Sequence, residues 1–219
     1  MLKNHVSGAK VDYTGIKKSP AKLNSYLDSL ANVRKSDYEN WSTDEKMAFL
    51  INLYNAATIK LIIDNQPLES IKDIGSIVNG PWKQEVVRLW GKIDTLDHVE
   101  HDLLRPKFKD PRVHFAVNCA SIGCPDILNE AFQASKLDAQ LDKQTRAFLA
   151  DSSRNRLDAK NKTLYLSSIF DWFKEDFVKK SGSVEKFVAP YFNDKDRAVI
   201  QRGGLKIKYT EYDWSLNGK

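Results

Sequence analysis

The segment 43–64 constrains the fold more than any other part of the chain. Ser42-Thr43-Asp44-Glu45 fits a capping box, and its acidic residues suit the positive end of a helix dipole. From Met47 to Ile62, apolar side chains occupy nearly every side of the predicted helix. A helix that is apolar all round is buried on all sides. The segment therefore predicts the central helix of a packed core.

Two amides interrupt this apolar surface. Asn52 and Asn55 are three residues apart, so they share one face of the helix. A buried amide without a partner costs about 1–3 kcal/mol, so we expect both to be hydrogen-bonded. Their partners are either a neighbouring loop or a functional side chain, and the sequence leaves both alternatives open.

The remaining pattern predicts an α+β fold, with the central helix packed on a small, mainly antiparallel sheet. Periodicity and capping signals predict further helices at 96–104, 135–150, 168–179 and 184–191, and short strands at 85–90, 113–118, 164–166 and 206–209. Residues 1–18 are expected to form an extended arm. Because the chain has no internal repeat or long flexible linker, we expect a single domain over 1–219.

The charge pattern bears on partners and location. The 34 Lys and Arg exceed the 29 Asp and Glu by only five, and most charged runs mix signs, as in 194–197. Without a basic stripe interleaved with aromatics, no nucleic-acid partner is expected. Asn52, Asn55 and Lys60 interrupt the longest apolar stretch, so no transmembrane segment is expected. Residues 1–5 contain no apolar signal core, which leaves a cytoplasmic protein or one whose export signal has been removed.

Reactive side chains concentrate between His98 and Cys124, a window that holds three of the four histidines. Cys119 follows the predicted strand 113–118 and opens a loop, a place where catalytic groups are often held. A thiol becomes a nucleophile only as the thiolate, which needs a nearby base or cation, and His101 would supply the base. A buried, inert Cys119 is the alternative.

Cys124 adds two further alternatives. Cys119 and Cys124 are five residues apart across a loop, which permits a disulfide, and His114 would complete three zinc ligands. The spacing matches no common zinc motif. On a strand, His114 and Cys119 would also point to opposite faces. We therefore expect both cysteines to be reduced or at most labile, and neither a metal nor another cofactor to be bound.

Three ordered segments resemble motifs of the domain-of-unknown-function 547 family. Residues 49–59 (FLINLYNAATI) are similar to its W-I-N-L-Y-N-A-x-T-I signature, with Leu50 in place of Trp. Residues 96–105 are similar to L-x-x-I-E-H-x-I-L-R, and residues 110–121 (DPRVHFAVNCAS), followed by Cys124-Pro125, to D-P-R-I-H-F-A-L-N-C-A-S and its closing C-P or S-P. With later motifs at 169–177 and 212–217, the resemblance is expected to span about 5–217.

The resemblance implies several properties. Bacterial members are commonly small exported proteins, which implies a periplasmic or extracellular location, while plant members have interaction roles. Cys119 stands at the family's first cysteine and Glu100-His101 at its Glu-His pair; the position of Cys124 also accepts Ser. The implied architecture is remotely similar to papain- and transglutaminase-like folds, in which the nucleophile opens the central helix. Residues 46–48 occupy that place here without a cysteine.

Two functional hypotheses follow. In the first, the protein is a cysteine-dependent hydrolase acting on an amide, thioester or peptide-like bond, with Cys119 as nucleophile and His101 as base. Glu100 completes this catalytic set by orienting the imidazole ring. Supporting or substrate-binding roles then go to Asn52, Asn55, Arg105, His114 and Cys124. In the second, the protein is a non-enzymatic binding or scaffold module, and the same polar residues are buried structural pins. The expected partner is a small molecule, a peptide or a protein.

Overall fold

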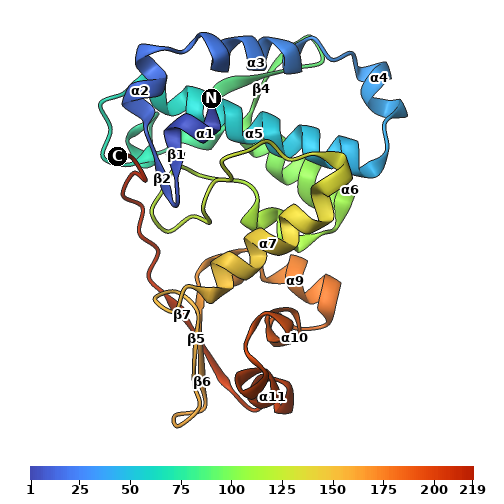
Figure 1. Ribbon diagram of the computed structural model, residues 1–219, viewed down its shortest axis with the longest axis vertical. Coiled ribbons are helices and arrows are strands. Elements are labelled where there is room, and N and C mark those ends of the chain that lie inside the picture. Colours follow the sequence, from blue (N-terminus) through green and yellow to red (C-terminus); the bar gives the residue numbers. More distant parts are fainter.

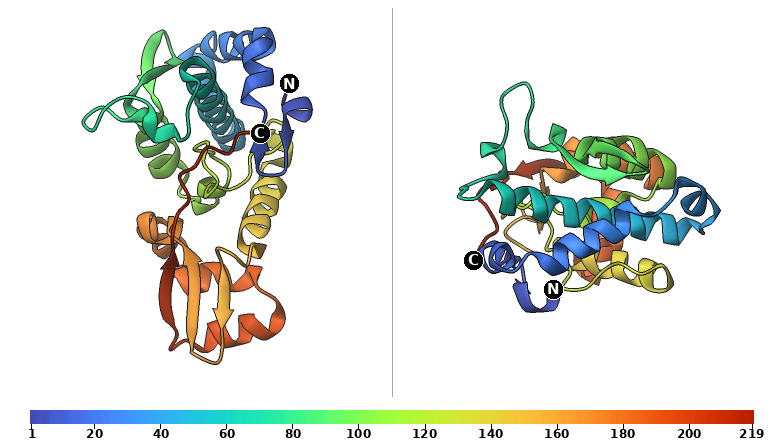
Figure 2. Two further views of the ribbon diagram at one scale, coloured as in Figure 1. Left: turned by 90° about the vertical axis from the view of Figure 1, so that its left-hand side faces the viewer. Right: turned by 90° about the horizontal axis from the view of Figure 1, so that it is seen from above.

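The computed structural model describes residues 1–219 as an elongated α+β molecule with two lobes (Figure 1). The first lobe holds the N-terminal half, and the second lobe, residues 151–210, lies below it. Helix α7 (Leu137–Ala150) joins the lobes, and the C-terminal tail after β7 (Lys206–Thr210) returns to the first lobe (Figure 2). The predicted α+β class is confirmed.

Helix α5 (Thr43–Asn65) is the central helix of the first lobe, as the sequence predicts. The capping box is complete, since Glu45 N donates to Ser42 Oγ at 3.3 Å and Ser42 N donates to Glu45 Oε2 at 2.8 Å. By length and composition α5 alone resembles a membrane span, but 83% of that stretch is buried inside the protein, as in a core helix. Its apolar surface is therefore used for packing within the lobe.

Short elements surround α5 in the first lobe. They are α1 (Leu2–His5), β1 (Val6–Ser7), β2 (Lys10–Val11), α2 (Tyr13–Lys18), α3 (Ala21–Ala31), α4 (Lys35–Asn40), β3 (Glu85–Leu89), β4 (Lys92–Thr95), a π-helix (His98–Leu104), α6 (Arg105–Phe108) and a 3₁₀ helix (Pro111–Phe115). Helix α5 packs against α2, α3, β3 and the π-helix. A core of 37 buried residues results.

The second lobe is built on a three-stranded sheet. It contains β5 (Arg156–Asp158), β6 (Thr163–Ser167), α8 (Ile169–Trp172), α9 (Lys174–Ser181), α10 (Val184–Val188), α11 (Asp194–Arg202) and β7. Strand β6 pairs antiparallel with β5 and parallel with β7, whereas β1–β2 and β3–β4 are antiparallel hairpins. The strands are thus divided among three small sheets, and β3 of the β3–β4 hairpin packs on the central helix.

An aromatic core of the second lobe reaches into the first. Phe170 and Phe177 lie 4.8 Å apart between ring centroids, and Phe115, from the 3₁₀ helix of the first lobe, packs against both. All three side chains are fully buried. Offset and tilted aromatic packing of this kind stabilises beyond simple area burial. Phe115 therefore fixes the two lobes to each other.

The extended arm expected for residues 1–18 is wrong. The segment folds into α1, the β1–β2 hairpin and α2. Asp12 caps α2 by accepting a hydrogen bond from Gly15 N at 2.8 Å. Tyr13 and Ile16 of this helix are buried and belong to the core of the first lobe. Packing against α5 orders this segment, although its own sequence pattern is weak.

The strand expected at 113–118 is also wrong. Pro111–Phe115 is a 3₁₀ helix, capped by Asp110, whose carboxylate accepts from Arg112 N at 3.0 Å. Proline at the first helical position favours this conformation because its φ is preset. The apolar residues at 113–117 indicate that the segment is buried. A buried strand and a buried helical turn both have this pattern, so it does not distinguish them.

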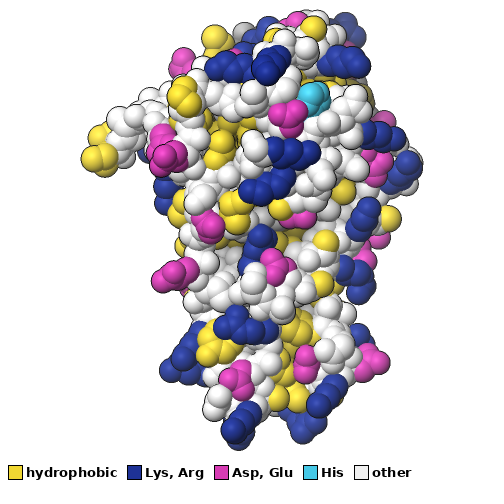
Figure 3. Space-filling view, turned by 60° about the vertical axis from the view of Figure 1, so that its left-hand side comes forward, with side chains coloured by type: hydrophobic (Ala, Val, Ile, Leu, Met, Phe, Trp, Pro, Cys, Tyr) yellow, Lys and Arg dark blue, Asp and Glu magenta, His cyan; other side chains and the backbone are white.

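Charges of both signs are interspersed over the face shown in Figure 3. The loop between Ile71–Asp73 and Pro81–Lys83 projects from the first lobe, with Ile77 and Val78 fully exposed. A protein surface normally contains some exposed apolar side chains, and these two adjacent residues are a small instance.

Candidate functional site

A cavity of about 330 Å³ lies where the two lobes meet, and both lobes line it. The first lobe contributes five residues that the sequence singled out: Glu100, His101, His114, Cys119 and Cys124. Helix α8, the residue after it and the C-terminal tail contribute aromatic side chains: Trp172, Phe173, Tyr212 and Trp214. The cavity is the candidate functional site because it collects nucleophilic, basic and acidic groups in one apolar recess.

Asn55 holds the loop that carries Cys119. Its Nδ2 donates to Ala116 O at 2.9 Å, and its Oδ1 accepts from Asn118 N at 2.8 Å. Asn118 then closes the loop, donating from Nδ2 to Pro125 O at 2.8 Å and accepting from Ala120 N at 2.9 Å. Asn55 is thus a structural pin for the segment around Cys119.

Asn52 pins a different loop. Its amide exchanges two hydrogen bonds with the backbone of Phe132, each 2.9 Å long. Asn52 and Asn55 both line a separate, largely apolar cavity of about 450 Å³ beside α3 and the N-terminus. Of the alternatives left open by the sequence, the neighbouring loop is therefore correct for both amides.

The Cys119 sulfur is surrounded by hydrogen-bonding groups. Cys124 Sγ lies at 2.8 Å, Tyr212 Oη at 3.0 Å and Ser121 Oγ at 3.1 Å. Burial raises the pKa of Cys119, but hydrogen bonds from Cys124, Ser121 and Tyr212 outweigh it and lower that pKa below its ordinary value. The groups around the Cys119 sulfur therefore favour its ionised form more than burial alone would allow.

Cys124 behaves in the opposite way. Burial, and then its hydrogen bond to Cys119, raise the pKa of Cys124 well above its ordinary value, so it remains a thiol that donates to Cys119. Neither cysteine forms a disulfide in this structure, and the reduced state expected from the sequence stays a prediction. No group of three or more His, Cys, Asp or Glu side chains is arranged to hold a metal ion.

Gly123 lets Tyr212 approach Cys119. A Cβ at Gly123 would lie 2.9 Å from the Tyr212 ring, closer than a side chain can sit. Gly123 N also donates to Asp213 O at 2.8 Å, which ties the C-terminal tail to the cysteine loop. A glycine here is required by close approach, and it allows the Tyr212 hydroxyl to contact both Cys119 and Ser121.

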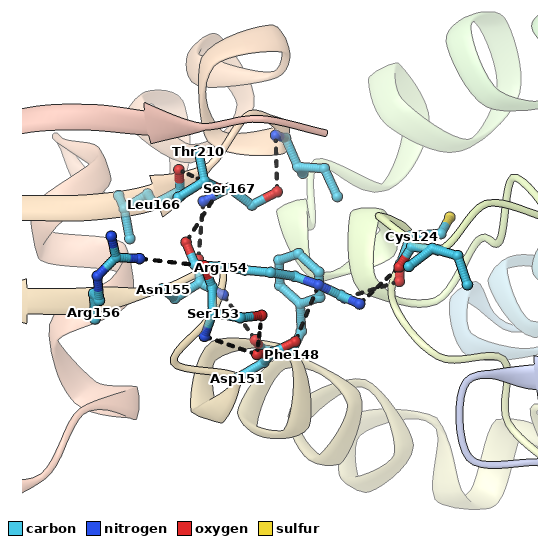
Figure 4. A network of polar contacts seen from close by, with 12 residues as sticks. Cys124, Phe148, Asp151, Ser153, Arg154, Asn155, Arg156, Leu166, Ser167 and Thr210 are labelled. Carbon is cyan, nitrogen blue, oxygen red and sulfur yellow. Dashed lines mark hydrogen bonds and ion pairs between the residues drawn. The ribbon is translucent and has the colours of Figure 1, made fainter. Parts of the chain in front are cut away.

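Arg154 holds the other side of the cysteine loop (Figure 4). Its guanidinium donates to Ile122 O at 2.7 Å and to Cys124 O at 3.1 Å, and it pairs with Asp151 at 3.1 Å. It reaches the loop from beyond α7, with its guanidinium 5.4 Å from the Phe148 ring centroid. Sequence reasoning missed Arg154, because no local pattern marks a contact 30 residues away.

His114 lines this cavity and has one buried ring nitrogen without a hydrogen-bond partner. Its Nε2 donates to Asp176 Oδ2 at 2.8 Å, its ring stacks on Phe173 with centroids 4.0 Å apart, and its buried Nδ1 has no hydrogen-bond partner. A carboxylate only accepts, so in the neutral ring Nε2 carries the hydrogen and Nδ1 the lone pair. The expectation that a strand separates His114 from Cys119 is wrong, since both line one cavity.

Asp176 orients His114 from the second lobe. It also accepts from Arg105 Nε at 2.7 Å. Burial acts to raise the pKa of Asp176, but the hydrogen bonds from His114 and Arg105 hold it well below its ordinary value. Sequence reasoning did not single out Asp176, although it lies within the expected motif at 169–177.

His101 and Arg105 engage each other instead of Cys119. Arg105 Nη1 donates to His101 Nδ1 at 2.8 Å. The three side-chain partners of Cys119 Sγ are a thiol and two hydroxyls, and neither imidazole hydrogen-bonds to it. The Cys119–His101 pair expected from the sequence is therefore not formed in this structure. Arg105 lines a neighbouring polar groove and is held by Asp176 and His101.

The sequence profile of one family, described as proteins of unknown function, matches residues 38–149, slightly more than half of the chain. The chain belongs to the DUF547 family. The matched DUF547 region contains Glu100, His101, His114, Cys119 and Cys124, and it ends within α7. From the sequence, the resemblance is expected to span about 5–217. The family match confirms it for residues 38–149, and the rest of that span stays a prediction. Asp176 and Tyr212 lie outside it.

Searches of curated proteins and of solved structures found no match. The remote papain and transglutaminase likeness therefore stays a prediction.

Proposed function

We propose that this DUF547 protein is a cysteine-dependent hydrolase that acts on an amide, thioester or peptide-like bond. The observation that carries the proposal is the environment of Cys119 Sγ, with three hydrogen-bonding groups within 3.1 Å at the wall of a cavity. Donors around a sulfur favour its ionised form, which is the nucleophile.

His114 is the proposed general base, with Asp176 as the residue that orients it. Its free Nδ1 takes the proton of the Cys119 thiol as the sulfur attacks the acyl carbon and a C–S bond forms. The C–N or C–S bond to the leaving group then breaks, and His114 returns the proton to that group. Water then hydrolyses the acyl-cysteine, and the thiol and the free acid are released. His101 is less suited, because Arg105 occupies its Nδ1.

Alkylation of Cys119 tests the proposal without a known substrate. At pH 6.5, after reduction, iodoacetamide should modify Cys119 several-fold faster than free cysteine, because its lowered pKa leaves more thiolate. Peptide mass spectrometry separates Cys119 from Cys124, which should react only on unfolding. Tyr212→Phe removes a donor, so it should raise the pKa and move the rate profile to higher pH.

His114→Gln removes the proposed base, so it should slow the alkylation of Cys119. His98→Gln is the matched control, because His98 is a more exposed histidine on the π-helix, and it should leave the alkylation rate unchanged. Circular dichroism checks that each variant is folded. If Cys119 reacts only in denaturant, and His114→Gln changes nothing, the hydrolase proposal fails. The binding or scaffold alternative then stands.

A further inference from the structure

The candidate cavity has an unusual lining for a protein with net positive charge. Six aromatic side chains face it: Tyr54, Trp82, Trp172, Phe173, Tyr212 and Trp214. Two carboxylates, Asp97 and Glu100, line it as well, and no lysine or arginine does. Aromatic faces and carboxylates both attract cations.

Glu100 is the most informative residue of this lining. Its side chain is buried, with 8% of the residue exposed, yet it forms no ion pair with any Lys, Arg or His of the protein. Its neighbour in the cavity is the buried Tyr54, whose pKa is raised by burial and further by the Glu100 charge. A buried carboxylate without a counter-ion is costly unless something else supplies the positive charge.

Rings of this lining already accept cations from the protein. Lys72 Nζ lies 3.8 Å from the ring centroid of Trp214, and the Arg105 guanidinium lies 4.8 Å from that of Phe173. Neither cation lines the cavity itself. Trp172, Tyr212 and Trp214 pack on one another, with centroids 4.5–5.7 Å apart, so their faces are held as a fixed wall.

We propose that this cavity binds an organic ammonium group, with Glu100 as its counter-ion and Trp172, Tyr212 and Trp214 as its aromatic wall. The inference deepens the proposed function, because it names the substrate class: acyl compounds that carry an ammonium group near the bond attacked by Cys119. Binding itself needs only the cavity, so it is measured separately from reactivity.

The test uses the full chain with Cys119→Ala, which removes the nucleophile and leaves the lining. Choline is the probe, and its uncharged carbon isostere 3,3-dimethyl-1-butanol is the matched control ligand. The five tryptophan indole N–H signals in a ¹⁵N NMR spectrum report the site. Choline should shift those of Trp82, Trp172 and Trp214, which line the cavity, and leave those of Trp41 and Trp90 unchanged. Its affinity should exceed that of the isostere by about tenfold.

Two variants assign the effect. Glu100→Gln should reduce the preference for choline to about threefold or less, and Trp172→Ala, at a half-exposed residue, should weaken choline binding with little risk to folding. Asp102→Asn, exposed on the same π-helix, should change neither. Equal affinity for the two ligands, no binding of choline, or a preference that survives Glu100→Gln would each overturn the inference. Alkylation of Cys119 in the native protein is independent of these results, so the hydrolase proposal succeeds or fails separately.

Discussion

Asn55→Leu is expected to lower the free energy of unfolding by about 2–4 kcal/mol. Leucine fills a similar volume, but it leaves two buried backbone groups, Ala116 O and Asn118 N, without hydrogen-bond partners. An unsatisfied buried group costs about 1–3 kcal/mol, and here two are created at once. Urea denaturation followed by circular dichroism measures the change.

Asn40→Leu serves as the matched control, because Asn40 is exposed and its single hydrogen bond is at the surface of α4. The variant should unfold within about 0.5 kcal/mol of the parent protein. The same experiment probes the site, since Asn55 positions the loop that carries Cys119. In folded Asn55→Leu protein, alkylation of Cys119 should lose its rate advantage. An unchanged urea midpoint for Asn55→Leu would show that the pin contributes nothing.

Asp176→Asn is expected to destabilise the protein by about 2 kcal/mol at pH 7 and to flatten its loss of stability in acid. Two charged hydrogen bonds, from His114 at 2.8 Å and Arg105 at 2.7 Å, depend on this carboxylate. Its pKa in the folded protein lies below that of the unfolded chain, so the ionised form is favoured by folding. This stabilisation is complete above the unfolded pKa, about 4, and is lost as the pH falls below it.

The stability of parent and Asp176→Asn proteins should therefore differ at pH 7 and converge as the pH falls through the acid range. Urea midpoints measured between pH 2 and 7 give this profile. Glu175→Gln is the control, because Glu175 is the neighbouring residue on α9 and pairs only with exposed Lys179. A constant difference between parent and Asp176→Asn at all pH values would mean that the carboxylate charge has no role in linking the lobes.

The sequence by itself determined the central helix and the α+β class. Helix α5 is encoded locally: its capping box lies within four residues, and its hydrogen bonds and apolar pattern repeat within each turn. The family motifs also lie in continuous segments, so Glu100, His101, Cys119 and Cys124 could be named as one cluster. The cavity does bring these four together. Their joint place in a site thus followed from residues close in the chain.

Tertiary structure decided the conformation of two segments. An apolar run such as 113–117 is compatible with a strand and with a buried helical turn. In the folded protein this segment is a 3₁₀ helix, and its Phe115 packs among aromatic side chains of the second lobe. Residues 1–18 carry too few apolar positions to show their helices, which are ordered by burial of Tyr13 and Ile16. In both cases the deciding contacts are distant in sequence.

Tertiary structure also decided which groups surround the sulfur and which imidazole keeps a free nitrogen. Tyr212 is 93 residues from Cys119 in sequence, and Asp176 is 62 residues from His114. Sequence reasoning chose His101 as base because a local pattern cannot show that Asp176 bonds to His114. The Arg105–His101 contact is local, four residues apart on a helix, and sequence reasoning overlooked it. Hydrogen bonds between distant elements depend on the packing of two lobes, and a pattern of neighbouring residues contains no information about that packing.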